Sequence, residues 1–197
     1  MDPSRDERDE VGDAWIFDVV KRNTYFFITF AVGKLDSATC EIFLERLKDC
    51  FVRQSSEEIA EFYSDTAQNR YTKLLAQLFI KKHLRYGQLM KFYSGTGRLT
   101  MKIRKTIFGK VPLERIDTTN VENFHGILRE HIGRLVRKTK CHFKLKTRLE
   151  SALQFYRFYW NFMWKIYGKS TPAVMEGLVE NTLNWDNFLH RTITIAN

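Results

Sequence analysis

Residues 14–32 read AWIFDVVKRNTYFFITFAV and are the clearest strand-forming segment of the chain. β-branched and aromatic residues fill 14–20 and 24–32, and the polar turn Lys21-Arg22-Asn23 separates the two runs. Such residues fit the pleated surface of a sheet, and two runs of strand length around a short polar turn are typical of a β-hairpin. We therefore expect two antiparallel strands here.

Helices and strands alternate after this hairpin. Asp36-Ser37 offers the cap of a helix that extends to Phe51, because apolar residues recur there every three or four positions. A short strand at 59–64 ends on Asp65, and a second amphipathic helix covers 67–82. The order β, β, α, β, α predicts an α/β fold in which helices flank a mixed central sheet.

The middle of the chain has weaker periodicity. Between residues 84 and 117 only 99–107 alternates well enough to predict a strand, and we assign the remainder to loops. A helix capped by Thr118, Thr119 or Asn120 is expected to extend to about residue 139.

The C-terminal part is predicted to be helical. An aromatic-rich helix is expected over 146–167, and one or two short helices follow from Pro172. Apolar residues cover nearly every side of the long helix, which favours burial against the sheet over stacking on unpaired bases. We divide the chain into a core of residues 1–145 and a helical extension of residues 146–197 that packs on it.

Positive charge is concentrated in one quarter of the chain. The net charge is +9, and residues 101–148 hold thirteen lysines and arginines against four acids, which is the same excess of nine. A localised basic segment of this kind is typical of proteins that bind nucleic-acid phosphates, with a merely solvated basic surface as the alternative.

Several classes of protein are disfavoured by the composition. The longest uncharged apolar run, at 25–33, is less than half of the roughly 20 residues that a membrane-spanning helix needs. The N-terminus is acidic, so we expect no secretory signal. The cysteines, at positions 40, 50 and 141, have no zinc or redox spacing, which fits a reducing compartment.

Two acidic residues stand at positions where chemistry is expected. At 100° per residue, Glu122, His125 and Arg129 share one face of the helix predicted after Thr118, although a solvated surface would also carry such residues. Asp65 follows a strand, where it lies at the rim of a sheet or caps the next helix. Carboxylates gathered at a rim suit Mg²⁺, and two metal ions can assist phosphoryl transfer.

Four segments resemble the DDE transposases of insertion sequences. They are AWIFDVVKRNTYFFITFAVG (14–33), FYSDTAQNRY (62–71), TTNVENFHGILREHIGRLVRKTKC (118–141) and TPAVMEGL (171–178), in the order that the family shows. The resemblance implies an RNase H-like domain with a mixed sheet that binds two Mg²⁺ ions, which Mn²⁺ can replace. Phe143 and His125 depart from the family, which usually has serine and asparagine there.

The resemblance also implies roles for individual residues. Asp65 and Glu122 would be two of three catalytic, metal-binding acids. Asp9 is our candidate for the remaining one, which comes first of the three along the chain. Asp18 is the alternative if residues 14–20 form the first strand of the sheet. The basic residues that we expect to bind DNA are Arg129, Arg134, Arg137, Lys138, Lys140, Lys102, Arg104 and Lys105.

The expected function is therefore magnesium-dependent DNA cleavage and strand transfer of an insertion element. The partners would be the element ends and the target DNA, bound by a homo-oligomer in the cytoplasm of a prokaryote, associated with the nucleoid and not with a membrane. The first alternative is a non-catalytic DNA-binding remnant or domesticated protein derived from a transposase. The second is a basic structural or protein-interaction module whose acids are ordinary surface residues.

Overall fold

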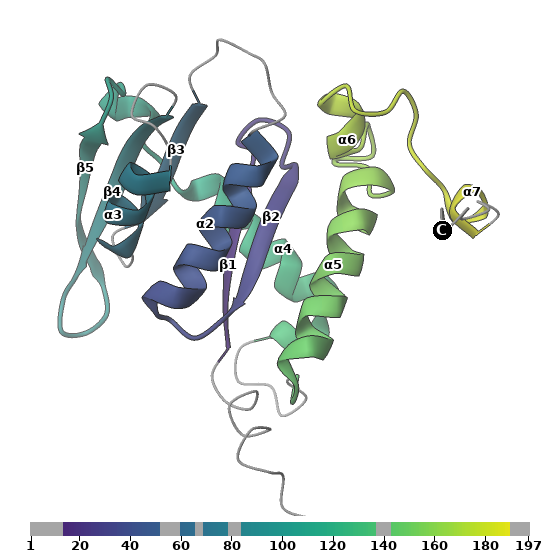
Figure 1. Ribbon diagram of the computed structural model, residues 1–197, viewed down its shortest axis with the longest axis horizontal. Coiled ribbons are helices and arrows are strands. Elements are labelled where there is room, and N and C mark those ends of the chain that lie inside the picture. The colour runs from purple at the N-terminus through teal and green to yellow at the C-terminus, as the bar shows by residue number, and fades with distance from the viewer. Residues whose placement is uncertain (1–13, 52–59, 66–68, 79–83, 137–142, 190–197) are drawn as a thin grey trace, which may run out of the picture.

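Five strands form the centre of the molecule, which we describe from a computed structural model that places residues 14–51, 60–65, 69–78, 84–136 and 143–189 (Figure 1). β1 (Trp15–Val20) and β2 (Phe27–Gly33) form an antiparallel pair. β3 (Ala60–Asp65) lies parallel to β4 (Leu84–Tyr93), which pairs antiparallel with β5 (Leu99–Phe108). The protein is thus an α/β protein with two hydrogen-bonded sheets.

The predicted hairpin at 14–32 is confirmed, with the second strand beginning at Phe27. Its strands are buried on both sides because successive side chains alternate between two hydrophobic clusters. Phe17 and Ala31 belong to a cluster with helix α2 (Ser37–Phe51), and Ile16 and Phe30 pack in a second cluster with helices nearer the C-terminus. The side of β1 that carries residues 16, 18 and 20 therefore faces this second cluster and its helices, which form a second layer.

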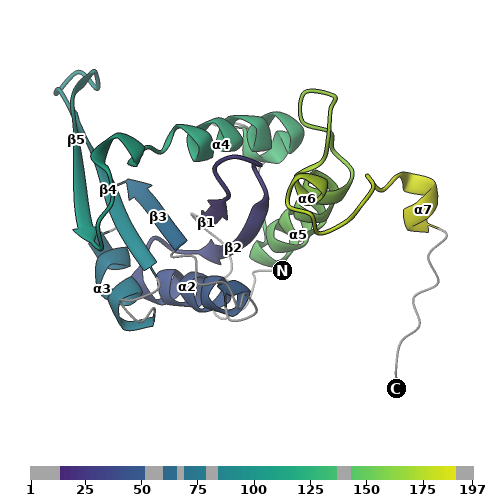
Figure 2. The same cartoon turned by 90° about the horizontal axis from the view of Figure 1, so that it is seen from above.

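The predicted α/β class is confirmed, and the strands of the predicted mixed sheet form two hydrogen-bonded sheets, of which β3–β4–β5 is mixed. In both views β3 lies between β4 and β1, but the hydrogen-bonded ladders stop at β1–β2 and at β3–β4–β5 (Figures 1 and 2). Side chains join the two sheets instead: one cluster contains Phe17 of β1, Phe43 of α2, Phe62 of β3 and Tyr86 of β4. The sheets therefore pack as one layer through their shared core.

β4 corrects the assignment of residues 84–93 to loops, whereas residues 94–98 form the turn before β5. Its burial pattern lacks simple alternation, because Gly87 and the polar Gln88 stand buried in its centre between Tyr86 and Leu89. Glycine is required at residue 87, since a Cβ there would lie 2.7 Å from the side chain of Ile116. A buried strand that contains a glycine and an amide has no period-2 hydrophobic pattern to recognise.

The two helices predicted before residue 84 are both present. α2 is capped by Asp36, whose Oδ1 accepts a hydrogen bond from the Thr39 amide at 2.8 Å. The strand predicted at 59–64 is β3, and the helix predicted at 67–82 is seen as α3 (Asn69–Leu78); residues 59, 67–68 and 79–82 of these predictions lie outside the described residues. Short helical segments complete the chain at η2 (Leu113–Arg115), η3 (Gly133–Leu135), α6 (Pro172–Met175) and α7 (Trp185–Leu189).

The two long helices of the second layer end earlier than predicted. α4 (Thr119–His131) ends before Gly133, because Ile132 leaves the helical region and the chain turns into η3. α5 (Lys146–Phe162) ends where the Met163 and Trp164 amides both bond to the Tyr159 carbonyl. The remainder of the helix predicted to residue 139 falls partly in 137–142, outside the described residues.

α5 is fastened to the outer strand β2. Asn161 accepts a hydrogen bond from the Phe27 amide and donates one to the Phe27 carbonyl, at 2.8 and 2.9 Å. Arg157 donates to the Ile28 carbonyl at 3.1 Å, and Arg46 of α2 donates to the Phe30 carbonyl at 2.9 Å. The helical C-terminal part therefore shares a core with β2 and α4. Within the described residues, no helix has the length and apolar character needed to cross a bilayer.

Candidate active site

Asp18 is a buried carboxylate in the middle of β1. Its side chain is 3% exposed, and its Oδ1 lies 2.7 Å from Nε2 of His125 on α4. Its second oxygen, Oδ2, is buried and has no hydrogen-bond partner among the described residues. Burial of a carboxylate is costly unless both oxygens are satisfied, so a buried carboxylate oxygen without a partner is uncommon and marks Asp18 as a candidate site residue.

The carboxylate of Asp18 shifts the pKa of His125. Burial of His125 alone would lower the pKa of the imidazole, but the hydrogen bond and negative charge of Asp18 outweigh that effect. The pKa of His125 is therefore raised above its ordinary value, and the imidazolium form is favoured in the folded protein. His125 and Asp18 act as a positioning pair that holds β1 against α4.

We expect the stability contributed by this pair to depend on pH. Because the pKa of His125 is raised in the folded state, the pair stabilises fully below about pH 6.5, the unfolded value, and this contribution is lost as the pH rises through the folded pKa. Asp18→Asn should therefore lower the free energy of unfolding in urea more at pH 6 than at pH 9. An equal loss at both pH values would contradict the ion pair.

Glu122 lies in the first turn of α4, one helical turn before His125. Its Oε1 accepts hydrogen bonds from the Lys91 ammonium of β4 and from the Thr118 hydroxyl, the latter at 2.5 Å. Burial would raise the pKa of this carboxyl, but the hydrogen bonds from Lys91 and Thr118 and the charge of Lys102 hold it below the usual range. Glu122 is thus ionised and half exposed, with 51% of its side chain accessible.

Asp65 is the last residue of β3 and is exposed. It pairs in register with Leu89 of β4, and paired residues point to the same side of a sheet. Leu89 packs with Ile116, which leads into α4, and Lys91 on the same side reaches Glu122. The structure therefore places Asp65 on the side of the sheet that faces Glu122, without a hydrogen bond or ion pair between the two carboxylates among the described residues.

Three of the acids considered from the sequence thus lie on one side of the strands. Figure 2 shows α4 on the side of the sheets opposite α2, alongside β3 and β1, which carry Asp65 and Asp18. Asp9 lies outside the described residues. Within the described residues, no three His, Cys, Asp or Glu side chains are close enough together to hold a metal ion.

The predicted DNA-binding residues divide between several surfaces. Lys102 and Arg104 of β5 pair with Lys91 and Leu89 and so lie on the side of Glu122. Arg129 donates to the His125 carbonyl at 3.1 Å, and Arg134 lies over the Phe143 ring. Arg137, Lys138 and Lys140 lie outside the described residues.

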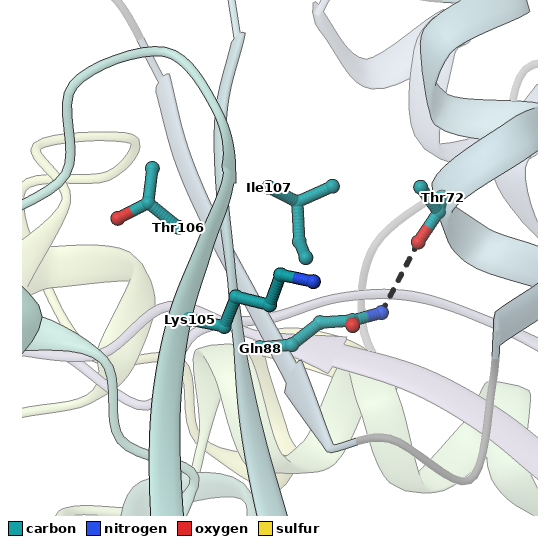
Figure 3. Close-up of a pocket in the computed structure, with 5 residues that line it drawn as sticks. All are labelled: Thr72, Gln88, Lys105, Thr106 and Ile107. Carbon is teal, nitrogen blue, oxygen red and sulfur yellow. Dashed lines mark hydrogen bonds between the residues drawn. The ribbon is translucent and has the colours of Figure 1, made fainter.

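Lys105 lies on the opposite side of the sheet from Lys102. It pairs with Gln88 and lines an open hollow of about 390 Å³ between α3 and β5, together with Thr72, Thr106 and Ile107 (Figure 3). Gln88 donates to the Thr72 hydroxyl at 3.2 Å across this hollow. Lys105 is therefore separated from the acids by the sheet.

Sequence reasoning misses the partner of Glu122. Lys91 lies in a segment whose pattern predicts loops, and only the register of β4 brings it beside α4. Thr118 is a cap candidate by sequence, and its hydroxyl instead binds the Glu122 carboxylate. The sequence signal for this contact is a threonine four residues before a glutamate at the start of a helix.

Comparison of the chain with protein-family models, curated proteins and solved structures finds no match. Function must therefore be inferred from the residues of the site.

Proposed function

We propose that this protein is a metal-dependent DNA-cleaving and strand-transferring enzyme of the DDE transposase type, with an RNase H-like fold. The observation that carries the proposal is the buried carboxylate of Asp18, whose free oxygen lies on the side of β1 that α4 covers. Strand order supports it: β2, β1, β3, β4 and β5 lie side by side, with an acid on β1, an acid at the end of β3 and an acid on α4.

In this proposal Asp18 takes the place of the first acid, and the candidate Asp9 lies outside the described residues. Asp18 lies on β1, reaches α4 through His125 and has an oxygen without a hydrogen-bond partner among the described residues, features that suit a ligand-binding carboxylate. Asp65 and Glu122 supply the other two carboxylates. The set offers hard oxygen donors, which Mg²⁺ and Mn²⁺ prefer over nitrogen and sulfur.

Two bound ions would stabilise the attacking and leaving oxygens of phosphoryl transfer. The chain itself supplies orientation and charge. His125 holds Asp18 in place, and Thr118 holds one oxygen of Glu122. Lys91 neutralises Glu122 in the free protein and, together with Lys102, offers positive charge to a phosphodiester. The proposed partners are element ends and target DNA, bound by a homo-oligomer in a prokaryotic cytoplasm.

A second candidate function is favoured by the Lys91–Glu122 ion pair. In this pair the charge of Glu122 is balanced by Lys91 and not by a metal ion. Such an arrangement is compatible with a protein that binds DNA without cutting it. The second candidate is a non-catalytic DNA-binding protein derived from the same kind of enzyme. It shares the basic surface with the first candidate and differs only in the role of the acids.

Nicking of supercoiled DNA separates the two candidates. We expect the wild-type protein to convert it to open circles in Mn²⁺ or Mg²⁺ and not in EDTA, and Asp65→Asn to remove this activity. Glu130→Gln is the matched control, because Glu130 is an exposed acid of the same helix as Glu122. Wild-type protein that binds DNA but never nicks it in either metal would leave only the second candidate.

A further inference from the structure

The open hollow between α3 and β5 has no role in the proposed function, because the sheet separates it from the acids. Its volume of about 390 Å³ is near the lower end of the range for pockets that bind small molecules, roughly 300–1,000 Å³. Figure 3 shows the side chains of Lys105, Gln88 and Thr72 pointing toward one another across it, beside Ile107. Three strands and helices thus contribute polar groups to one space.

A chain of hydrogen bonds fixes the orientation of the Gln88 amide in this hollow. The Ser64 hydroxyl donates to the Asp65 carbonyl at 2.9 Å, and a carbonyl can only accept. The Tyr86 hydroxyl, 2.7 Å from Ser64 Oγ, therefore gives its own proton to Ser64 and accepts one from Gln88 Nε2 at 2.7 Å. The second proton of Nε2 goes to the Thr72 hydroxyl at 3.2 Å. Both amide protons of Gln88 are thereby used inside the protein.

The carbonyl oxygen of the same amide is left facing the hollow. Gln88 is 4% exposed, and its Oε1 accepts no hydrogen bond from any of the described residues. Buried polar side-chain atoms without a partner are uncommon, and this one is held in place by the bonds that Nε2 makes. The hollow therefore presents a fixed acceptor that a hydrogen-bond donor on a ligand can satisfy.

Lys105 supplies a positive charge beside this acceptor. It pairs in register with Gln88, and its ammonium has no carboxylate partner in the part of the chain that the structure describes. A cation next to a neutral acceptor favours a ligand with an anionic group and a neighbouring hydroxyl. An ammonium donor on the ligand would be repelled by Lys105. A phosphodiester of a nucleic-acid backbone carries no donor, so it meets only half of this requirement.

We propose that this hollow binds a small hydroxylated anion, either a hydroxy carboxylate or a phosphorylated polyol. The anionic group pairs with the ammonium of Lys105, the hydroxyl donates to Oε1 of Gln88, and the carbon chain lies against Ile107. The site does not rest on the proposed function and stands whether or not the protein cuts DNA.

Titration of the isotope-labelled full chain with L-lactate or with glycerol 3-phosphate, followed by NMR, tests the proposal. Both probes carry an anionic group and a hydroxyl, and the tighter of the two identifies a carboxylate or a phosphate ligand. We expect saturable shifts of the Gln88 side-chain amide and of the backbone amides of Lys105 and Ile107. Propionate lacks the hydroxyl and lactamide lacks the charge, so each should bind about 10-fold more weakly than lactate.

Variants of Lys105 test the charge at the same site. Lys105→Ala should weaken the binding of both probes by at least about 10-fold, because a charge-assisted hydrogen bond is lost. Lys105→Arg keeps the charge and should bind within a few-fold of wild type. Lys110→Ala is the matched control, because it removes another exposed positive charge just beyond the end of β5. Circular dichroism checks that each variant is folded.

Each part of the proposal can be overturned separately. The absence of a saturable shift with either probe would refute the site. Equal losses in Lys105→Ala and Lys110→Ala would refute it as well, because binding would then reflect positive charge without a preferred place. Propionate that binds as tightly as lactate would remove the hydroxyl contact to Gln88, on which the choice of ligand depends.

Discussion

Asp18→Asn and Glu122→Gln should each lower metal-dependent nicking by at least about 100-fold. Residues that only support a metal ligand typically cost about 10–100-fold when they are replaced, and a direct ligand costs at least as much. Both substitutions keep the shape of the side chain, and the amide introduced in place of Asp18 can still bond to His125, so the loss would come from the carboxylate charge. The measurement is the initial rate of nicking in Mn²⁺, with Glu130→Gln as control.

Binding of Mn²⁺ gives a second readout for the same variants. Calorimetric titration of the protein with Mn²⁺ should lose at least one site in Asp18→Asn, while affinity for duplex DNA stays within a few-fold of wild type. A variant at Asp18 that nicks DNA at the wild-type rate would remove Asp18 from the catalytic set. Loss of activity in Glu130→Gln as well would mean that removing any negative charge from α4 impairs nicking, and Glu122 would then have no specific role.

Trp160→Ala should have the largest effect on stability, a loss of about 3–5 kcal/mol in the free energy of unfolding. Trp160 is 1% exposed and packs against Phe124 of α4 at a ring distance of 5.3 Å. Its Nε1 also donates to the Tyr25 carbonyl at 2.8 Å, so the substitution leaves a cavity and an unsatisfied carbonyl. Urea unfolding followed by circular dichroism measures the change.

Phe155→Ala is the matched control for this experiment. Phe155 lies on the same helix and is 53% exposed, with Trp185 of α7 stacked beside it at 6.1 Å. Because more than half of Phe155 stays in contact with water, its loss should cost less than that of Trp160. Equal destabilisation by the two substitutions would contradict the packing of α5 on β2 and α4.

The elements that can be predicted from the sequence are those whose pattern is local. The hairpin at 14–32 is marked by β-branched and aromatic residues, and α2 is marked by Asp36 and a regular apolar spacing. β4 escapes prediction because its burial comes from contacts with distant segments. Gly87 is needed by Ile116, and Gln88 is buried through its bond to the Tyr86 hydroxyl at 2.7 Å. No local periodicity records such contacts.

The site can be predicted in part for the same reason. Glu122 and His125 share a face of α4 through helical spacing alone, and the structure agrees. The contact of Asp18 with α4 cannot be predicted from the sequence, because both sides of β1 carry apolar residues and the pattern does not say which side faces α4. Lys91 and Lys102 become neighbours of Glu122 only through the register of β4 and β5.

The bonds that α5 and α2 make to β2 have a consequence for self-association. An outer strand with free amides and carbonyls is a template onto which a strand of another molecule can add. On β2, Asn161, Arg157 and Arg46 already occupy backbone groups of Phe27, Ile28 and Phe30. Fewer backbone groups of β2 are therefore left to template strand addition, and at the other outer strand, β5, like charges of Lys102, Arg104 and Lys105 would oppose pairing with a second copy.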